Sequence, residues 1–97
     1  MMMQTRTFDV VDLINLVAAD HDWDLCFDSG PGDSRELIYS RTDRSGADLE
    51  LQIALDFTGR IERADFRREG EVVRHIGVDK WTSAADVHVL TLELFKR

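Results

Sequence analysis

The segment Asp20-His21-Asp22-Trp23-Asp24 places one imidazole among three carboxylates. Both groups are common metal ligands. The segment lacks the regular spacing of a ligand motif such as His-x-x-x-His, and ligand identity alone is weak evidence for a metal site. A solvated corner between a helix and a strand explains the same residues. His75 and His88 have no motif around them. We therefore predict no metal and no cofactor.

Cys26 is the only cysteine and is a candidate nucleophile. It alternates with Asp24 and Asp28 on one side of a predicted strand. Nearby negative charge disfavours the thiolate, which is the reactive form of cysteine. We therefore predict a small strand residue at this position, and no catalytic residue set anywhere in the chain. A single cysteine also excludes an internal disulfide and is typical of a reducing compartment.

Two loop motifs are rejected on the residues that surround them. The loop Gly30-Pro31-Gly32 resembles a phosphate cradle in composition, but no Lys follows it, and Asp28 and Asp33 flank it with the wrong charge. No stretch matches the twelve-residue calcium-binding loop with ligands at alternate positions and a terminal Glu.

Five arginines between positions 60 and 74 form a candidate nucleic-acid surface: Arg60, Arg63, Arg67, Arg68 and Arg74. Four acidic residues interleave with them and leave a net charge of +1 over these fifteen residues. Proteins that bind nucleic acid need many cationic groups that are not cancelled locally. Ion pairs between neighbouring strands are the better interpretation, and we predict no nucleic-acid partner.

The strongest feature of the sequence is an acidic flank. From Thr7 to Ser34 there are seven aspartates and no Lys or Arg, whereas residues 35–97 carry eleven basic and twelve acidic residues. Such a flank repels phosphates and attracts cationic surfaces. The alternative is that it only keeps a small domain soluble. Six aspartates are the candidate partner-binding residues: Asp9, Asp12, Asp20, Asp22, Asp24 and Asp28.

The elements that would position these side chains begin with a helix over residues 9–21. Its apolar stripe is predicted to be Val10, Leu13, Ile14 and Val17, with Asp9 as the N-cap. Strands are predicted at 23–28, 35–41, 48–57, 60–68 and 71–76. The strand residues expected to face the core are Trp23, Leu25, Phe27, Leu37, Tyr39, Leu49, Leu51, Ile53, Leu55 and Phe57.

The hairpin around Thr58-Gly59 fixes the register of its two strands. A loop of two or four residues pairs Leu51 with Phe66 and Ile53 with Ala64, and it places Glu50 opposite Arg67. Residues 83–96 have strand propensity at their centre, but Thr82 or Ser83 can cap a helix, and a helix is favoured.

The elements together predict an α+β fold: a two-layer sandwich with an N-terminal helix, an antiparallel β-meander of four to five strands and a C-terminal helix. Residues 1–97 form a single domain, and both helices cover the apolar sheet face. The hydrophobic content of 43% and charged content of 32% are those of a globular protein. No segment approaches the length of a membrane span, so we expect a cytoplasmic protein without a membrane partner.

Three functions remain open at this point. The first is a protein-interaction module, such as an inhibitor, an immunity protein or an adaptor, that docks a partner with a basic surface. The second is a ligand-binding or enzymatic domain with a pocket between sheet and helices, using His21 or His75. The third is a homodimer that pairs through an edge strand or the polar sheet face.

Overall fold

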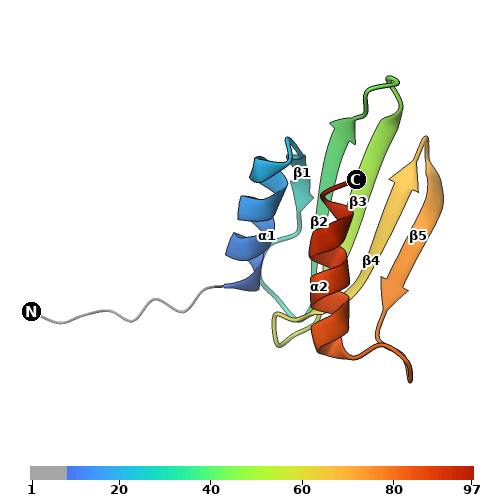
Figure 1. The fold of residues 1–97 in the computed structure, drawn as a ribbon. Helices are drawn as coiled ribbons and strands as arrows, with labels where there is room; N and C mark the ends of the chain where they lie inside the picture. Colours follow the sequence, from blue (N-terminus) through green and yellow to red (C-terminus); the bar gives the residue numbers. More distant parts are fainter. Residues whose placement is uncertain (1–8) are drawn as a thin grey trace, which may run out of the picture.

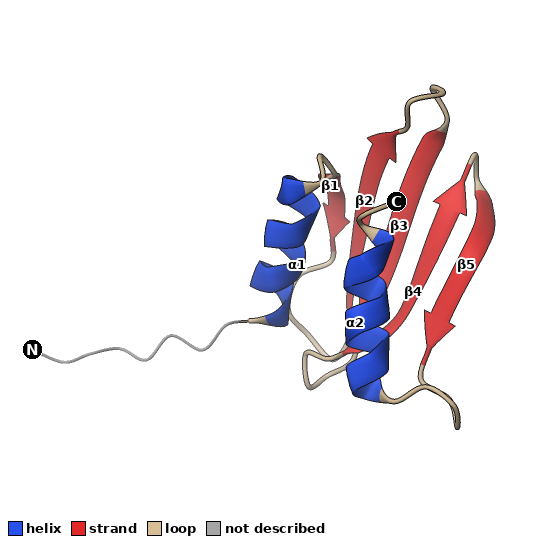
Figure 2. Cartoon of the chain, in the orientation of Figure 1, coloured by secondary structure: helices blue, strands red, loops and turns tan. Residues whose placement is uncertain are grey.

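The computed structural model describes residues 9–97 and has two helices and five strands (Figures 1 and 2). Both helices cover one face of the sheet, which leaves the other face open and confirms the predicted α+β sandwich. The elements are α1 (Val10–Asp20), β1 (Asp24–Asp28), β2 (Arg35–Thr42), β3 (Asp48–Leu55), β4 (Ile61–Arg68), β5 (Glu71–Gly77) and α2 (Ala84–Leu94).

The sheet is an antiparallel meander in which the strands keep their sequence order from β1 to β5. The predicted register of the β3–β4 hairpin is confirmed, since Leu51 pairs with Phe66 and Glu50 with Arg67. A one-residue slip would have turned charged side chains toward the core. Among the described strands β1 and β5 form the two edges, so they are the strands that expose backbone groups.

The core lies between the helices and the sheet. Leu37, Leu51 and Ile53 are fully buried on the helix-covered face. The hydroxyl of Tyr39 donates a hydrogen bond to the side-chain oxygen of Asn15, which ties α1 to β2. Burial raises the pKa of Tyr39 above its usual value, so this hydroxyl stays protonated and remains a donor.

The first predicted helix is present, but its buried stripe differs from the prediction. Val11, Ile14 and Ala18 are buried, whereas Val10 and Val17 only pack against the core from its margin. The helix is therefore rotated by about one residue from the predicted stripe. Because α1 packs against β1 at the edge of the sheet, one side of its apolar surface stays next to solvent.

The prediction that Phe57 faces the core is wrong. β3 ends at Leu55, and Phe57 is 79% exposed. The turn begins at Asp56, whose carboxylate accepts hydrogen bonds from the backbone N–H groups of Thr58 (2.9 Å) and Arg60 (3.1 Å). These bonds remove Phe57 from the alternation that the preceding residues follow.

The prediction for the first strand is wrong for the face of Phe27, and Leu25 lies on the predicted face but is not buried. Trp23 is buried, but it precedes β1, and Leu25 and Phe27 are 45% and 47% exposed. A β-bulge at Cys26 interrupts the alternation, so Leu25 lies opposite Tyr39 and Phe27 lies opposite Ile38. Phe27 therefore belongs to the open face of the sheet.

The ambiguous C-terminal segment is a helix, as favoured from the sequence. The Ser83 hydroxyl accepts from the backbone N–H of Asp86, and the Asp86 carboxylate accepts from the N–H of Ser83. This capping box fixes the start of α2. Burial of Val87 and Leu94 against the sheet then outweighs the strand propensity of the valines.

Truncation of Leu51 tests the core. Leu51 is fully buried in the central strand, so Leu51→Ala should lower the free energy of unfolding by about 2–5 kcal/mol. Urea denaturation monitored by tryptophan fluorescence measures this change. The matched control is Leu16→Ala, because Leu16 is half exposed on α1. Equal, small effects of the two variants would contradict this core.

Thr91 offers a second test, because it is fully buried and its hydroxyl has no hydrogen-bond partner among the described residues. Thr91→Val removes an unsatisfied polar group and nearly preserves the volume. It should raise the free energy of unfolding by about 1 kcal/mol. Thr91→Ser, which keeps the hydroxyl and loses the methyl group, should lower it. A loss of stability in Thr91→Val would show that the hydroxyl is bonded.

Candidate functional site: an acidic edge of the sheet

The predicted partner-binding aspartates lie at one side of the molecule, where α1 packs beside the edge strand β1 (Figure 1). Asp20, Asp22 and Asp24 lie close together where α1 ends and β1 begins. Asp12 lies on the first turn of the same helix. Asp9 and Asp28 lie at the opposite ends of these two elements.

Four of these aspartates have free carboxylates. Asp12, Asp20, Asp22 and Asp24 are all exposed, and within residues 9–97 none of them takes part in an ion pair. We call these four residues the acidic edge. No ion pair among the described residues neutralises their charge.

The other two aspartates are engaged within the fold. Asp9 is the N-cap of α1, where its side chain accepts from the N–H of Val11 at 3.1 Å. Asp28 accepts two hydrogen bonds from the Arg35 guanidinium, at 2.8 and 2.7 Å, and one from the N–H of Gly30. The bonds from Arg35 are the main reason that the pKa of Asp28 is lowered to about 2.

Exposed apolar side chains accompany the acidic edge. Leu16 projects from α1 and Leu25 from β1, and both are among the large apolar residues that remain exposed. Apolar contacts supply most of the binding energy of protein interfaces, and charged groups at the rim supply orientation and association rate. The acidic edge therefore combines carboxylates that hold no ion pair among the described residues with exposed apolar side chains.

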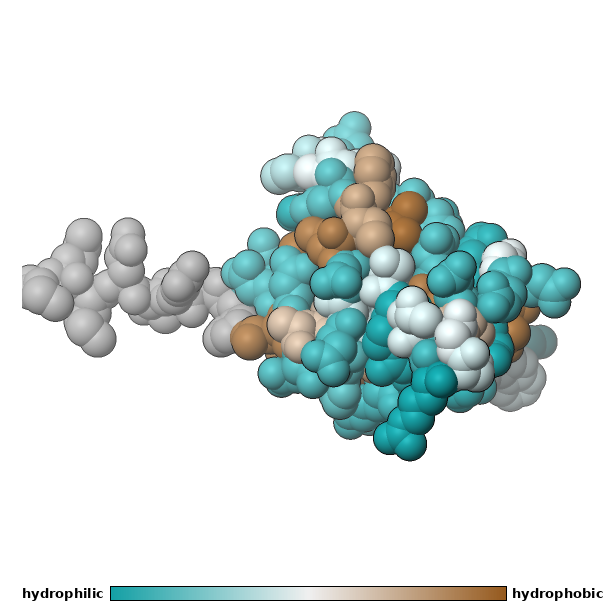
Figure 3. All heavy atoms as spheres, turned by 90° about the horizontal axis from the view of Figure 1, so that it is seen from above, coloured by the Kyte–Doolittle hydropathy of each residue, from teal (hydrophilic) through white to brown (hydrophobic). Residues whose placement is uncertain are grey.

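An open hollow of about 900 Å³ adjoins the acidic edge. Asp22 and Asp24 line one side, while the β2–β3 loop and the C-terminal residues Lys96 and Arg97 line the other. Figure 3 views this end of the molecule and shows a mostly hydrophilic surface with small, separate apolar groups. The sequence alone does not indicate this hollow, because the two sides of the hollow come from segments far apart in the chain.

Arg41 is one of the residues that line this hollow. Its guanidinium lies 5.0 Å from the centre of the Trp23 ring and donates to the carbonyl groups of His21 (3.3 Å) and Arg97. Arg68 is paired with Asp43 at 3.1 Å. Both arginines therefore contact groups within the chain, while Arg44 and Arg97 also line the hollow.

The candidate catalytic residues do not converge. His75 contacts the carboxylate of Asp65 on the open face of the sheet, not between sheet and helices. His21 is the C-cap of α1. The Cys26 sulfur lies 2.8 Å from the Ser40 hydroxyl oxygen and is exposed. Within the described part of the chain, no three His, Cys, Asp or Glu side chains come together as metal ligands.

Comparison of the chain with models of protein families, with curated proteins and with solved structures found no significant match. Over residues 9–97, no helix combines the length and the apolar character that crossing a membrane requires.

The ion pair of Asp28 predicts a dependence of stability on pH. The folded pKa of about 2 lies below the ordinary value of 3.8, so the contribution of Asp28 is present above pH 4 and is lost as the pH falls toward 2. Asp28→Asn should therefore show a smaller fall in urea midpoint between pH 5.5 and pH 2.5 than the unchanged protein. Asp33→Asn, in the loop that follows Asp28, is the control. An equal effect of both variants would refute the assignment.

Proposed function

We propose that this protein is a small acidic interaction module that docks a cationic surface of another protein through the acidic edge. The observation that carries the proposal is the concentration of unpaired negative charge on α1 and β1. The segment from Thr7 to Ser34, which contains both elements, has seven aspartates and no Lys or Arg. Asp12, Asp20, Asp22 and Asp24 hold no ion pair among the described residues and are exposed side by side with apolar groups.

Electrostatics gives this surface a defined role in binding. Long-range attraction between the acidic edge and a basic partner raises the rate of encounter, and it is screened over a Debye length of roughly 8 Å at physiological ionic strength. Leu16 and Leu25 then supply apolar area that leaves water on contact. An inhibitor, an immunity protein and an adaptor all use this chemistry, and none of them needs a catalytic residue or a cofactor.

The sign of the charge restricts the partner. A carboxylate-rich edge repels phosphate groups, so nucleic acid and anionic membrane surfaces are unsuitable ligands. A protein surface rich in Lys and Arg is suitable, and Arg forms two-pronged hydrogen bonds with carboxylates. Solubility alone is the competing explanation of the flank, and the following experiment separates the two.

Asp20→Lys is the cleanest test of the acidic edge. Asp20 lies in the last turn of α1, where the helix dipole favours a cation, so the substitution should not destabilise the fold. Asp22 is less suitable because its backbone has a left-handed φ of 62°. A partner isolated by affinity capture and purified should associate with Asp20→Lys at least several-fold more slowly at low salt. The difference should shrink at physiological salt.

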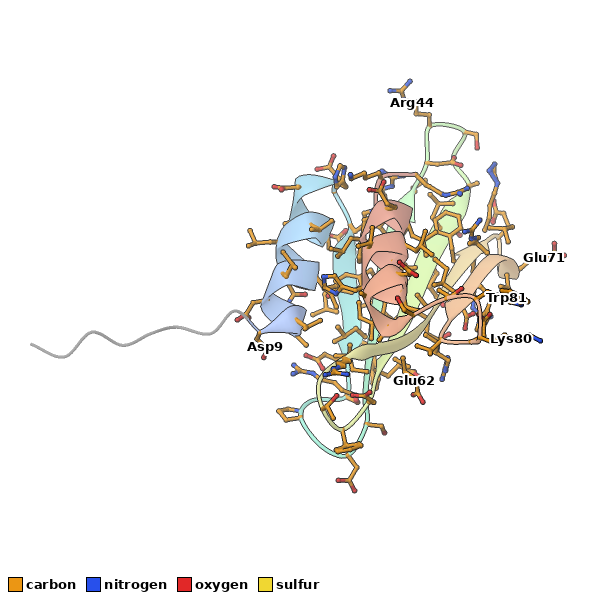
Figure 4. All side chains as sticks on the ribbon, turned by 60° about the horizontal axis from the view of Figure 1, so that its bottom comes forward. Asp9, Arg44, Glu62, Glu71, Lys80 and Trp81 are labelled. Carbon is orange, nitrogen blue, oxygen red and sulfur yellow. The ribbon has the colours of Figure 1, made fainter. Side chains whose placement is uncertain are left out.

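The matched control is Glu62→Lys, which makes the same charge change at an exposed residue of β4, away from the acidic edge (Figure 4). It should bind like the unchanged protein. If Asp20→Lys and Asp24→Lys both bind with unchanged rate and affinity, the acidic edge only aids solubility. The proposed function is then wrong for that partner.

A further inference from the structure

The second edge of the sheet, β5, carries a bulge that changes which side chains share a face. Arg67 pairs with Val72 and Phe66 pairs with Arg74, so Val73 has no residue of its own opposite it on β4. At the beginning of the strand Glu71 pairs with Arg68. Two residues of β5 therefore oppose a single residue of β4 at this point.

The bulge brings Glu71 and Arg74 to the same face. In a regular strand, residues three apart point to opposite faces. Here Glu71 lies opposite Arg68, and Arg74 lies opposite Phe66, which is buried under the helices. Arg68 and Phe66 are two residues apart on β4 and share its helix-covered face. Glu71 and Arg74 consequently share that face too, with Val72 and Val73 between them.

This four-residue segment is exposed and unpaired in charge. Glu71, Val72, Val73 and Arg74 are all exposed, the two valines by 48% and 55%. Glu71 projects outward at the margin of the sheet (Figure 4). Within residues 9–97 neither Glu71 nor Arg74 takes part in an ion pair. An acidic and a basic group of the same edge thus lie free on either side of an exposed apolar pair.

We propose that β5 pairs antiparallel with β5 of a second copy of this chain, around a two-fold axis between Val72 and Val73. In this register Glu71 lies opposite the partner's Arg74, and Val72 lies opposite the partner's Val73. The symmetry repeats each pair, which gives two ion pairs and two apolar pairs. Opposite charges and valine pairs directly across an antiparallel ladder both stabilise it.

The bulge also makes this axis geometrically possible. Hydrogen-bonded and non-hydrogen-bonded residue pairs alternate along a regular antiparallel ladder. An axis between two neighbouring residues would relate a pair of one kind to a pair of the other kind, which regular strands do not allow. The bulge interrupts the alternation at Val72 and Val73. Glu71 and Arg74 pair with residues two apart on β4, so both belong to the same kind of residue pair. A two-fold axis between the valines can therefore relate them.

The opposite edge of the sheet cannot pair with itself in this way. β1 begins at Asp24 and ends at Asp28, and its middle residue is Cys26. Antiparallel pairing of two copies around Cys26 places Asp24 opposite the partner's Asp28. Like charges directly opposite each other destabilise a ladder. A second copy is therefore the occupant that suits β5 and not β1.

The contact is small, which sets its strength. Pairing through one short strand belongs to the class of interfaces that bury less than about 1,200 Å² and form transiently. The dimer should therefore dissociate on dilution. It leaves the acidic edge free, so it is independent of the proposed function and can fail without affecting it.

Charge exchange tests the pairing in the full chain. Sedimentation equilibrium over a series of protein concentrations should show a monomer–dimer equilibrium. Glu71→Arg and Arg74→Glu should each weaken the dimer by about tenfold or more, because each variant sets two like-charged pairs across the axis. The double variant Glu71→Arg/Arg74→Glu should recover most of the affinity. Glu62→Arg, with the same change of net charge as Glu71→Arg, should leave it unchanged.

Disulfide trapping tests the register. In a Cys26→Ser background, a mixture of Val72→Cys and Val73→Cys chains should cross-link faster than either variant alone, since each residue faces the other across the axis. A chain that stays monomeric at every concentration overturns the proposal. So does a dimer that is insensitive to Glu71→Arg, or a double variant without recovery, provided that circular dichroism shows native secondary structure.

Discussion

The hydrogen bond from the Trp23 indole to the carbonyl of Phe95, at 2.8 Å, is the contact on which the arrangement of the layers depends. Trp23 follows the first helix and Phe95 follows the second, so this bond joins the C-terminal ends of α1 and α2. The Trp23 ring packs edge-on against Phe95, and Arg41 stacks on it while binding carbonyls from both helix ends. Both helices are therefore held on one face, running in the same direction (Figure 2). A buried indole N–H without its acceptor would be costly.

Because both helices cover one face of the sheet, the two proposed contacts lie at its edge strands. The helix-covered face is filled mainly by core side chains, and the charged side chains that share it, such as Arg41 and Arg68, lie at or next to the ends of their strands. On the open face, Arg63 and His75 contact Asp65, so much of its charge is cancelled locally. At the first edge four carboxylates hold no ion pair among the described residues, and the proposed partner there is basic. At the last edge an acidic and a basic residue balance each other, which favours a second copy. Opposite edges of one sheet thus differ in charge pattern and in the partner they suit.

Much of the fold could be predicted because its local signals agree. The caps at Asp9 and Ser83, and the Glu50–Arg67 register, follow from side-chain chemistry that acts over a few residues. The errors have different causes. Phe27 lies beyond the bulge in β1, where alternation no longer predicts the face, and Leu25 keeps its predicted face but is exposed at the edge of the sheet. Phe57 follows Asp56, whose carboxylate starts a turn. The acidic edge could be counted from composition. Which aspartates belong to it could not be predicted, because the hydrogen bonds from Arg35 to Asp28 depend on how the β1–β2 loop folds.

The placement of the acidic edge and β5 on opposite sides of the sheet has a consequence for avidity. Two copies joined through β5 would form one continuous sheet with an acidic edge at each far end. Such a particle is bivalent, and its two sites are held at a fixed separation by strands rather than by a linker. Once the first site is bound, the second meets its target at a high effective concentration, provided that the spacing matches. A partner with repeated basic surfaces would then be bound far more tightly than one with a single surface.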